Sequence, residues 1–209
     1  TNQNQMEMGD VHPLNLLEHI LFTGADGMVY RTWLLNNELI QYTVQMYTEN
    51  VHRYMIRDSY NSGTWNHLAR WAANSDHMIE QAVKNGDANS EAIALTMRAL
   101  FVSNWTDIYG DIPFIDHQLD LDDYSDYPRI PREQVTARLL QDLDDDLLDY
   151  LPVQWNPGTY GTTRIGRVAA YALKARIALN WGLWEEAARC SKIATTLAEG
   201  VYDLEPLDC

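Results

Sequence analysis

The chain has 209 residues, of which 46% are hydrophobic, and its 30 acidic side chains outnumber 15 basic ones to give a formal net charge of −15. This composition is typical of a globular protein rather than a disordered one, and no apolar run approaches the roughly 20 residues that span a bilayer. The acidic balance argues against nucleic acid as a partner, because phosphate contacts need Lys and Arg.

The first part of the chain is predicted to be helical. Residues 14–23 indicate a short helix that ends near Gly24, and residues 29–52 indicate a longer one, because apolar side chains recur at helical spacing in both. Residues 53–63 are rich in Tyr and polar side chains, and we expect them to form a loop.

Two longer helices are predicted next. The first covers residues 65–84, with Thr64 as its N-cap and Gly86 as its end. The second covers residues 91–109, with Ser90 as its N-cap. Both carry a continuous apolar stripe at the 3.6-residue period, which predicts that they pack side by side in a core.

The sequence YGDIPF ends the second of these helices. Gly110 can adopt the left-handed conformation that closes a helix, and Pro113 prevents the helix from restarting. We expect a loop over residues 110–131, and then a helix over residues 132–151 that stops at Pro152.

Two Ala-rich helices are predicted at residues 165–181 and 184–198, joined at Gly182. The joint, GLWEEA, has the Gly-x-aromatic-x-Glu-Ala pattern of a tetratricopeptide-like hairpin, although no clean second copy occurs at a 34-residue period. In this pattern the aromatic ring fills the groove between the helices. We therefore expect Trp184 to be buried and its replacement by Ala to cost about 3–5 kcal/mol.

Four stretches together resemble the SusD/RagB family of nutrient-binding outer-membrane lipoproteins. The resemblance covers about residues 64–206 and is strongest over 91–206. In this sequence the four stretches are Tyr109-Gly110-Asp111-Ile112-Pro113, then Ile130-Pro131-Arg132 with Asp142-Leu143 and Leu151-Pro152, then Arg164 to Arg176 with its Ala169-Ala170-Tyr171-Ala172-Leu173 run, and Gly182 to Ala187 leading to Tyr202-Asp203-Leu204. Two positions depart from the family pattern, where Thr163 replaces a glycine and Lys174 a leucine.

The resemblance and the helical periodicities together predict an all-α fold of tetratricopeptide-like helical hairpins. We expect one helical domain over residues 1–209, similar to the SusD-like α–α superhelix. Family members are more than twice as long as this chain, so the resemblance implies that the C-terminal half of the family fold is lacking. By the same resemblance, the Tyr-Gly-Asp-Ile-Pro stop is a structural corner and has no catalytic role.

The resemblance also implies a function. The expected activity is non-catalytic binding of an oligosaccharide or another nutrient at the bacterial cell surface, followed by its delivery to a SusC-type TonB-dependent transporter. The expected location is the outer membrane, reached through a lipid anchor whose cysteine and signal peptide are not in this chain. No cofactor is expected.

The segment 47–63 is the candidate for ligand recognition, because its rings can stack on sugar faces and its polar side chains can reach hydroxyl groups. An alternative is that this Tyr-rich segment only packs against its own domain. The candidate ligand-binding residues are Tyr47, His52, Arg53, Tyr54, Tyr60 and Asn61.

No catalytic or metal-binding residue is predicted, because no nucleophile motif, phosphate loop or paired-His motif occurs. The Asp-rich loop at 116–126 lacks the calcium-binding pattern, and a solvated loop is its simpler interpretation. Two other functions remain open. One is a helical-repeat adaptor that binds proteins through a concave face, and the other is an all-α glycosidase that uses two carboxylates.

Overall fold

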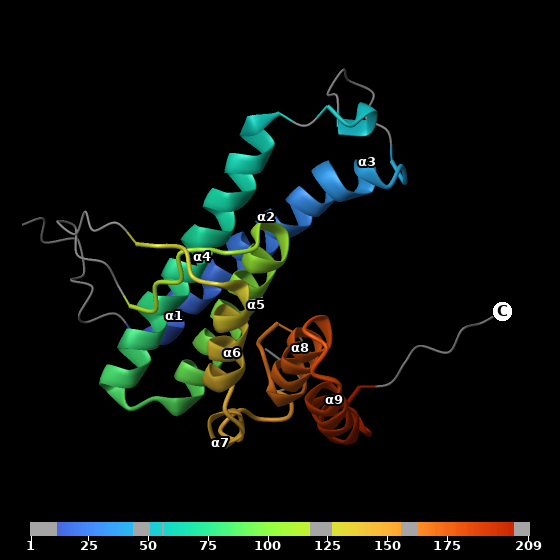
Figure 1. Ribbon diagram of the computed structural model, residues 1–209. Coiled ribbons are helices and arrows are strands. Elements are labelled where there is room, and N and C mark those ends of the chain that lie inside the picture. The colour runs from blue at the N-terminus through green and yellow to red at the C-terminus, as the bar shows by residue number, and fades with distance from the viewer. Residues whose placement is uncertain (1–11, 44–50, 56, 118–126, 156–162, 203–209) are drawn as a thin grey trace, which may run out of the picture.

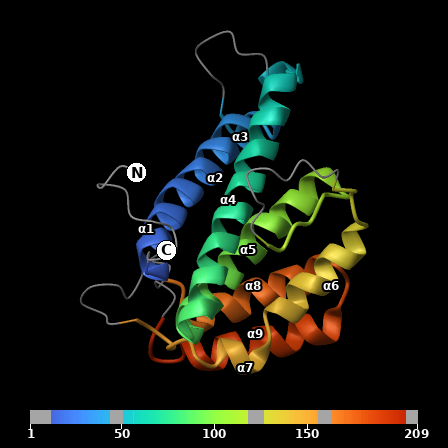
Figure 2. The ribbon, with the colours of Figure 1, turned by 90° about the vertical axis from the view of Figure 1, so that its left-hand side faces the viewer.

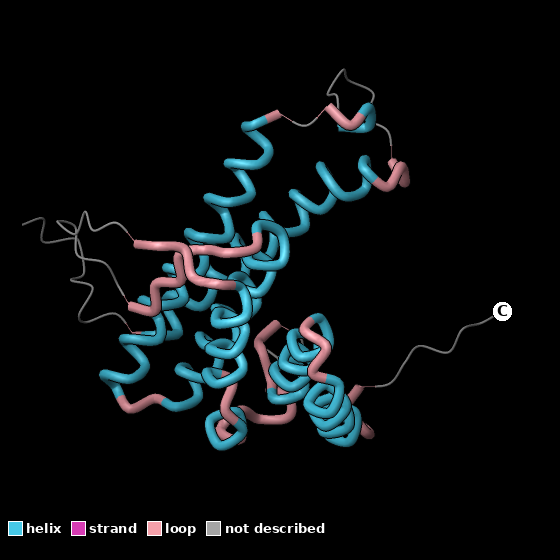
Figure 3. Tube along the Cα trace, viewed as in Figure 1, coloured by secondary structure: helices cyan, strands magenta, loops and turns pink. Residues whose placement is uncertain are grey.

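The structure is a computed structural model that describes residues 12–43, 51–55, 57–117, 127–155 and 163–202. Within these ranges every regular element is a helix (Figure 3), and β pairing is limited to one isolated bridge between Ile112 and Ile130. The all-α prediction is therefore confirmed. The elements are α1 (Pro13–His19), η2 (Ile20–Gly24), α2 (Ala25–Arg31), η3 (Thr32–Asn36), α3 (Asn37–Leu39), η4 (Val51–Arg53), α4 (Asp58–Asn85), α5 (Ala88–Tyr109), α6 (Arg132–Asp142), α7 (Asp145–Leu148), α8 (Arg167–Asn180) and α9 (Trp184–Ala198).

The elements from α1 to α3 form one continuous helical rod, in which η2 and η3 are π-helical turns. Figure 1 shows this rod in blue, beside α4. The predicted stop at Gly24 is wrong, because Gly24 has a helical φ of −66° and the helix continues through it. The second predicted helix, 29–52, ends earlier than expected, at Leu39, and Gln41 follows in the left-handed region with φ 60°.

Gly24 has a packing role instead of ending a helix. A Cβ atom on Gly24 would lie 2.7 Å from Cζ of the buried Phe101, so only glycine lets the rod approach α5 this closely. The contact continues on α4, where Nε2 of His67 lies 3.1 Å from the Gly24 carbonyl oxygen. The His19 ring meets the Trp71 ring edge to face, with centroids 5.1 Å apart.

The helices α4 and α5 form a long hairpin that turns at Gly86, whose left-handed φ of 65° confirms it as the helix end. With 28 and 22 residues they are about 42 and 33 Å long, so the first turns of α4 extend past the end of α5. The predicted loop 53–63 is wrong in its second half, because α4 begins at Asp58. Thr64 is therefore not an N-cap but an interior residue, whose hydroxyl donates to the Tyr60 carbonyl at 3.0 Å.

The helix α5 is at the centre of the molecule and is buried on nearly all sides. Its N-cap is Asp87, which accepts a hydrogen bond from the Ser90 N–H at 3.1 Å, and not Ser90 as predicted. Gly110 ends α5 as expected, with φ 75°. The corner is then fixed to α6, because Asp111 Oδ1 accepts from the Arg132 N–H at 3.0 Å.

The predicted helix 132–151 is divided into α6 and α7. Leu143 leaves the helical region (ψ 51°), and Asp144 caps α7 by accepting from the Asp146 N–H at 3.1 Å. A side chain that offers the backbone such a bond favours a new helix start over a continued helix. The apolar stripe is kept across the break, and its fully buried members are Val135, Leu139, Leu143, Leu148 and Leu151.

The helices α8 and α9 form the predicted hairpin, with Gly182 in the left-handed region at φ 69°. Trp184, however, is 67% exposed, so the prediction that it fills the groove between the helices is wrong. Small side chains form that interface instead. The buried ones among them are Ala175, Ala178, Ala187, Cys190 and Ala194.

Figure 2 shows the layers in order, with the rod of α1 to α3 first, the α4–α5 hairpin next, and α6 to α9 packed together on the far side of α5. The core is continuous through these layers. None of the helices in the described ranges has the combination of length and apolarity that crossing a membrane requires.

Candidate functional site

The structure describes five of the six predicted ligand-binding residues, whereas Tyr47 lies outside the described ranges. Three of the five follow one another on η4 and directly after it, and two lie in the first turn of α4. Both groups are found at the end of the molecule where α3 ends (Figure 1). The first group is His52, Arg53 and Tyr54, and the second is Tyr60 and Asn61.

These residues differ in the solvent exposure of their side chains and in their hydrogen bonds. Tyr54 has a left-handed φ of 59° and is 63% exposed, and its hydroxyl accepts a hydrogen bond from Gln41 Nε2 at 3.3 Å. His52, by contrast, is half-buried. The backbone carbonyl of Asn61 accepts from the Tyr109 hydroxyl at 2.6 Å, so this residue helps to hold α4 against the end of α5.

Three further aromatic residues, which the sequence prediction did not select, are exposed on α2, on η3 and directly after α3. Tyr30, Trp33 and Tyr42 are 53%, 49% and 82% exposed. The rings of Tyr30 and Trp33 are 6.0 Å apart between centroids, with a tilt of 40° between their planes. We call these three residues and Tyr54 the arm-end surface.

The arm-end surface is suited to contact with a ligand that has both apolar and hydroxyl-bearing parts. Exposed rings in one region are unusual on a protein that needs no partner there, and Tyr and Trp pair a flat apolar face with a polar edge. Gln41 and Arg53 add hydrogen-bonding side chains beside Tyr54. A sugar ring presents an apolar C–H face and a rim of hydroxyl groups, which matches this combination.

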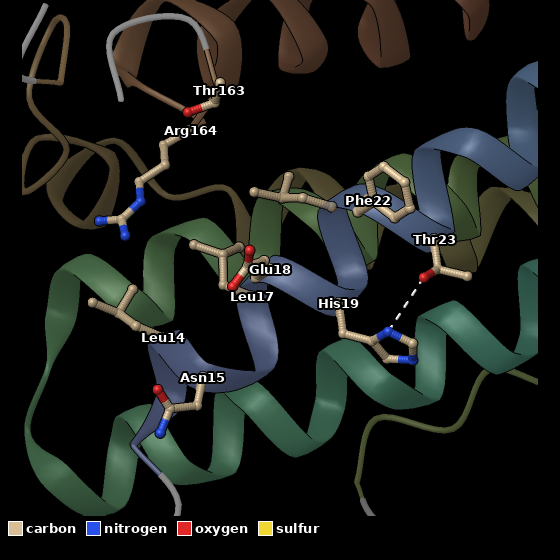
Figure 4. Close-up of a pocket in the computed structure, with 10 residues that line it drawn as sticks. Leu14, Asn15, Leu17, Glu18, His19, Phe22, Thr23, Thr163 and Arg164 are labelled. Atoms are coloured by element: carbon tan, nitrogen blue, oxygen red, sulfur yellow. Dashed lines mark hydrogen bonds between the residues drawn. The ribbon is translucent and has the colours of Figure 1, made fainter. Parts of the chain in front are cut away.

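A second candidate is a cavity of about 920 Å³ between α1, η2 and the segment before α8, which we call the α1 cavity. Figure 4 shows Leu14, Glu18 and Phe22 on one side of it and Arg164 on the other. The Phe22 ring is 76% exposed. One ring with a carboxylate and a guanidinium around it can contact a polar organic molecule, a sugar or a peptide.

The far wall of the α1 cavity is held by Trp155, whose Nε1 donates to the Ile165 carbonyl at 2.8 Å. The Arg164 guanidinium carbon lies 5.6 Å from the centre of the Trp155 ring. Sequence reasoning missed this cavity because it joins residues about 150 positions apart. The only local signal is Phe22, an aromatic residue on the polar side of a predicted helix.

A network of buried charges links three helices. Arg98, which is 4% exposed, donates from Nη1 to Asp76 on α4 at 2.7 Å and from Nη2 to Asp142 on α6 at 2.6 Å. Burial raises the pKa of Asp76 to about 6, although the Arg98 charge lowers it part of the way back. Arg138 extends the network by donating to Asp116 at 2.5 Å.

A second ion cluster joins α7, α8 and α9. Asp145 accepts from Lys174 at 2.7 Å and from Arg189 at 2.6 Å, and Arg189 also pairs with Glu186. The Arg189 hydrogen bonds lower the pKa of Glu186 to about 2, whereas burial and then the Glu186 contact raise the pKa of the Cys190 thiol to about 11. Cys190 is therefore a buried thiol that forms the reactive thiolate less readily than a free cysteine does.

Metal chemistry finds little support in the part of the chain that the structure describes. No three His, Cys, Asp or Glu side chains are placed there to hold an ion. Of the predicted Asp-rich loop only Asp116 is described, and it binds Arg138. The other members, Asp120, Asp122, Asp123 and Asp126, lie outside the described residues.

A comparison with protein-family models assigns the chain to a family. The SusD-like family, described as "Starch-binding associating with outer membrane", matches residues 3–158, well over half of the chain. The chain belongs to the SusD-like family. The resemblance seen in the sequence is thereby confirmed. No curated protein matches the chain.

Solved structures of SusD-like proteins share the fold. A SusD superfamily protein from Bacteroides thetaiotaomicron superposes with a TM-score of 0.71 at 16% identity, over 90% of this chain and 47% of that one. A SusD-like protein from Bacteroides fragilis gives 0.61 at 20% identity, over 70% and 29%. Surface glycan-binding protein A from Bacteroides fluxus gives 0.58 at 20% identity, over 69% and 31%. The chain spans less than half the length of each of these proteins.

Proposed function

We propose that this SusD-like protein binds an oligosaccharide through the arm-end surface. The observation that carries the proposal is a set of four rings, each 49–82% exposed, on α2, on η3, after α3 and after η4, of which Tyr30 and Trp33 lie 6.0 Å apart. Leaving large apolar faces in water is unfavourable by about 25 cal/mol per Å². Stacking on the C–H face of a sugar removes those faces from water while the hydroxyl rim keeps its hydrogen bonds to polar neighbours.

The ligands of related proteins point in the same direction. The family description names starch binding, one structural relative is a laminarin-binding SusD-like protein, and another is a surface glycan-binding protein. These ligands belong to those proteins, and we extend only their class, a glycan, to this chain. His52, Arg53, Tyr60 and Asn61 remain proposed contacts beside the rings.

In this proposal the protein binds the glycan without hydrolysing it. A glycosidase needs two carboxylates facing each other across a cleft, one of them free to transfer a proton. Three carboxylates of the buried and clustered ion networks are instead held by cations, since Asp76 and Asp142 bind Arg98 and Asp145 binds Lys174. Incubation with a polysaccharide panel should therefore release no new reducing ends above the background of the buffer. Steady release would favour the glycosidase alternative.

The site can be tested by native gel electrophoresis through gels that contain starch or laminarin. A glycan that binds slows the protein relative to a gel without polysaccharide. Tyr42→Ala and Tyr54→Ala should restore the mobility, because each removes one stacking ring. Tyr150→Ala is the matched control, since Tyr150 is also exposed but lies on the far side of α5. Equal retardation of all four proteins would place the binding site elsewhere.

Delivery is the second part of the proposal. We infer that the bound glycan passes to a SusC-type TonB-dependent transporter, and that a lipid anchor holds the protein at the outer surface of the outer membrane. The family description supports association with the outer membrane. The native protein, purified from its own bacterial membranes in mild detergent, should bring a transporter of this type with it. Recovery without any transporter would argue against delivery and leave glycan binding intact.

A further inference from the structure

The outer face of the rod of α1 to α3 carries a row of exposed side chains. Its apolar members, Phe22, Val29, Tyr30 and Trp33, are each at least 49% exposed, and Asp26 between them is exposed as well. These positions follow one another in steps of three or four residues, so they lie on one side of the helix. We call these five residues the rod stripe. The rod is the outer layer of the molecule (Figure 2).

Contacts with the core fix the direction in which the rod stripe faces. A Cβ atom on Gly24 would lie 2.7 Å from Phe101 of α5, and one on Gly27 would clash with the His67 ring of α4. The Arg31 guanidinium also lies beside α4. Positions 24, 27 and 31 therefore face inward, and the rod stripe faces away from the core. Because the backbone of the rod approaches its neighbours so closely, the rings of the stripe are held on a rigid surface.

Both π-helical turns of the rod carry a ring of the stripe. The turn η2 contains Phe22, and the turn η3 contains Trp33. Such turns are rare, and within α-helices they occur frequently at functional sites. Phe22 also lines the α1 cavity, near Glu18 (Figure 4). Tyr30 and Trp33 belong to the arm-end surface, so the rod stripe connects the two candidate sites.

The chemistry of the rod stripe alternates between flat apolar faces and an oxygen acceptor. The Asp26 carboxylate lies between Phe22 and the Tyr30–Trp33 pair, where it can accept hydrogen bonds from hydroxyl groups. A glycan chain presents C–H faces and hydroxyl donors in turn along its length. An anionic lipid surface is a poor match, because the stripe carries a negative charge and Arg31 is turned toward α4.

We propose that the rod stripe continues the arm-end surface as the binding surface for one long, linear glycan chain, which lies along the rod from Trp33 to Phe22. The inference rests on the proposed function and adds the class of ligand, a long chain rather than one or two sugar residues. Positions 22 and 33 are about 16 Å apart along a helix axis, which is more than a disaccharide spans. Once one ring has bound the chain, contact with the next ring is intramolecular, so affinity rises with chain length.

The test is titration calorimetry with two pairs of sugars, maltose with maltoheptaose and laminaribiose with laminariheptaose. At least one heptasaccharide should bind about tenfold or more tightly than its disaccharide. Phe22→Ala should weaken binding of that heptasaccharide by about threefold to tenfold, because one stacking ring is lost. Phe22→Tyr keeps a ring and should bind as the wild type does. Tyr150→Ala is the matched control, since Tyr150 is exposed but is not on the rod.

Three results would overturn the proposal. The first is equal affinity for a disaccharide and its heptasaccharide, or no binding of either heptasaccharide. The second is wild-type affinity for the heptasaccharide in Phe22→Ala, whose fold is checked by an unchanged melting midpoint because Phe22 is 76% exposed. The third is a wild-type dimer in light scattering that Phe22→Ala converts to a monomer, which would show that the stripe pairs with a second copy instead.

The same variants distinguish this inference from the proposed function. Heptasaccharide binding that is weakened by Tyr54→Ala but not by Phe22→Ala leaves the arm-end surface standing and refutes the rod stripe. Binding that is weakened by Phe22→Ala but not by Tyr42→Ala or Tyr54→Ala supports the rod stripe and contradicts the role of those two tyrosines. Asp26→Ala, which removes the oxygen acceptor, should weaken binding in the same direction as Phe22→Ala.

Discussion

At the scale of single residues, glycines show what local sequence can and cannot predict. Gly86, Gly110 and Gly182 all have left-handed φ angles, and all three were predicted from the sequence as turn positions. A left-handed φ is a local property, which a neighbouring helix pattern reveals. Gly24 was misassigned because its role depends on Phe101, a residue that only the fold brings near.

The packing role of Gly24 predicts that substitution by Ala has opposite effects on stability at Gly24 and at Gly63. Gly24→Ala should destabilise the protein by about 1–2 kcal/mol, because the new methyl group would lie 2.7 Å from the buried Phe101 ring. Gly63→Ala should be neutral or stabilise by up to about 1 kcal/mol, because its nearest neighbour is the flexible end of Arg31, at 3.1 Å, and Ala favours a helix. Urea unfolding of both variants measures the difference. Equal effects would contradict the packing role of Gly24.

Asp76 makes stability depend on pH. Its pKa is raised from 3.8 to about 6 by burial, and by Asp116 and Glu80, against the opposing effect of Arg98. The folded protein therefore holds this proton more tightly than the unfolded chain does. Its contribution to stability is full below about pH 4 and is lost as the pH rises through 6, by about 3 kcal/mol in total.

The measurement for Asp76 is the free energy of unfolding between pH 4 and pH 7, in the wild type and in Asp76→Asn. The difference, wild type minus variant, should fall as the pH rises, because only the wild type loses the proton. Subtraction removes the opposite trend of Asp145 and Glu186, whose lowered pKa values make them lose stability in acid. A difference that stays constant between pH 4 and pH 7 would contradict the raised pKa of Asp76.

At the scale of elements, α5 and α8 lie close to their predicted bounds, and the bounds of α9 are correct at both ends. The helix α4 begins earlier than predicted, and the predicted helix 132–151 is two helices. The errors have physical causes. The break between α6 and α7 comes from the capping carboxylate of Asp144, and the continuity of α1 to α3 comes from packing against α4 and α5. Periodicity predicts which face of a helix is buried, but caps and tertiary contacts set where the helix begins and ends.

The exposed indole on α9 changes what is expected of the α8–α9 hairpin. Trp184→Ala should lower the free energy of unfolding by less than about 1 kcal/mol, because most of the ring is in solvent. Ile177→Ala, at a position on α8 that is 2% exposed, should cost about 2–5 kcal/mol. Thermal unfolding of both variants shows which substitution lowers the stability more. A larger loss for Trp184→Ala would restore the sequence prediction that this ring fills the interface.

At the scale of the whole molecule, the candidate sites depend on how distant segments meet. Tyr54 was selected from the sequence because it lies in a Tyr-rich stretch. Tyr42 was missed because the pattern predicted one helix to residue 52, whereas α3 ends at Leu39 and Tyr42 follows it. Tyr30 and Trp33 were missed because an apolar ring within a predicted helix is expected to be buried, whereas both are exposed on the rod. The α1 cavity joins residues of α1 and η2 to Thr163 and Arg164, and no local pattern in the sequence predicts such a site.

The central claim, that the arm-end surface binds a glycan, is tested most directly by titration calorimetry on two Trp variants. Both Trp33 and Trp184 are exposed, but only Trp33 belongs to the arm-end surface. The titrant is a soluble oligosaccharide of whichever polysaccharide slows the protein in gels. The account predicts that Trp33→Ala weakens binding about tenfold or more, equivalent to about 1.4 kcal/mol, while Trp184→Ala binds as the wild type does. Wild-type affinity in Trp33→Ala, together with loss in Trp184→Ala, would contradict it.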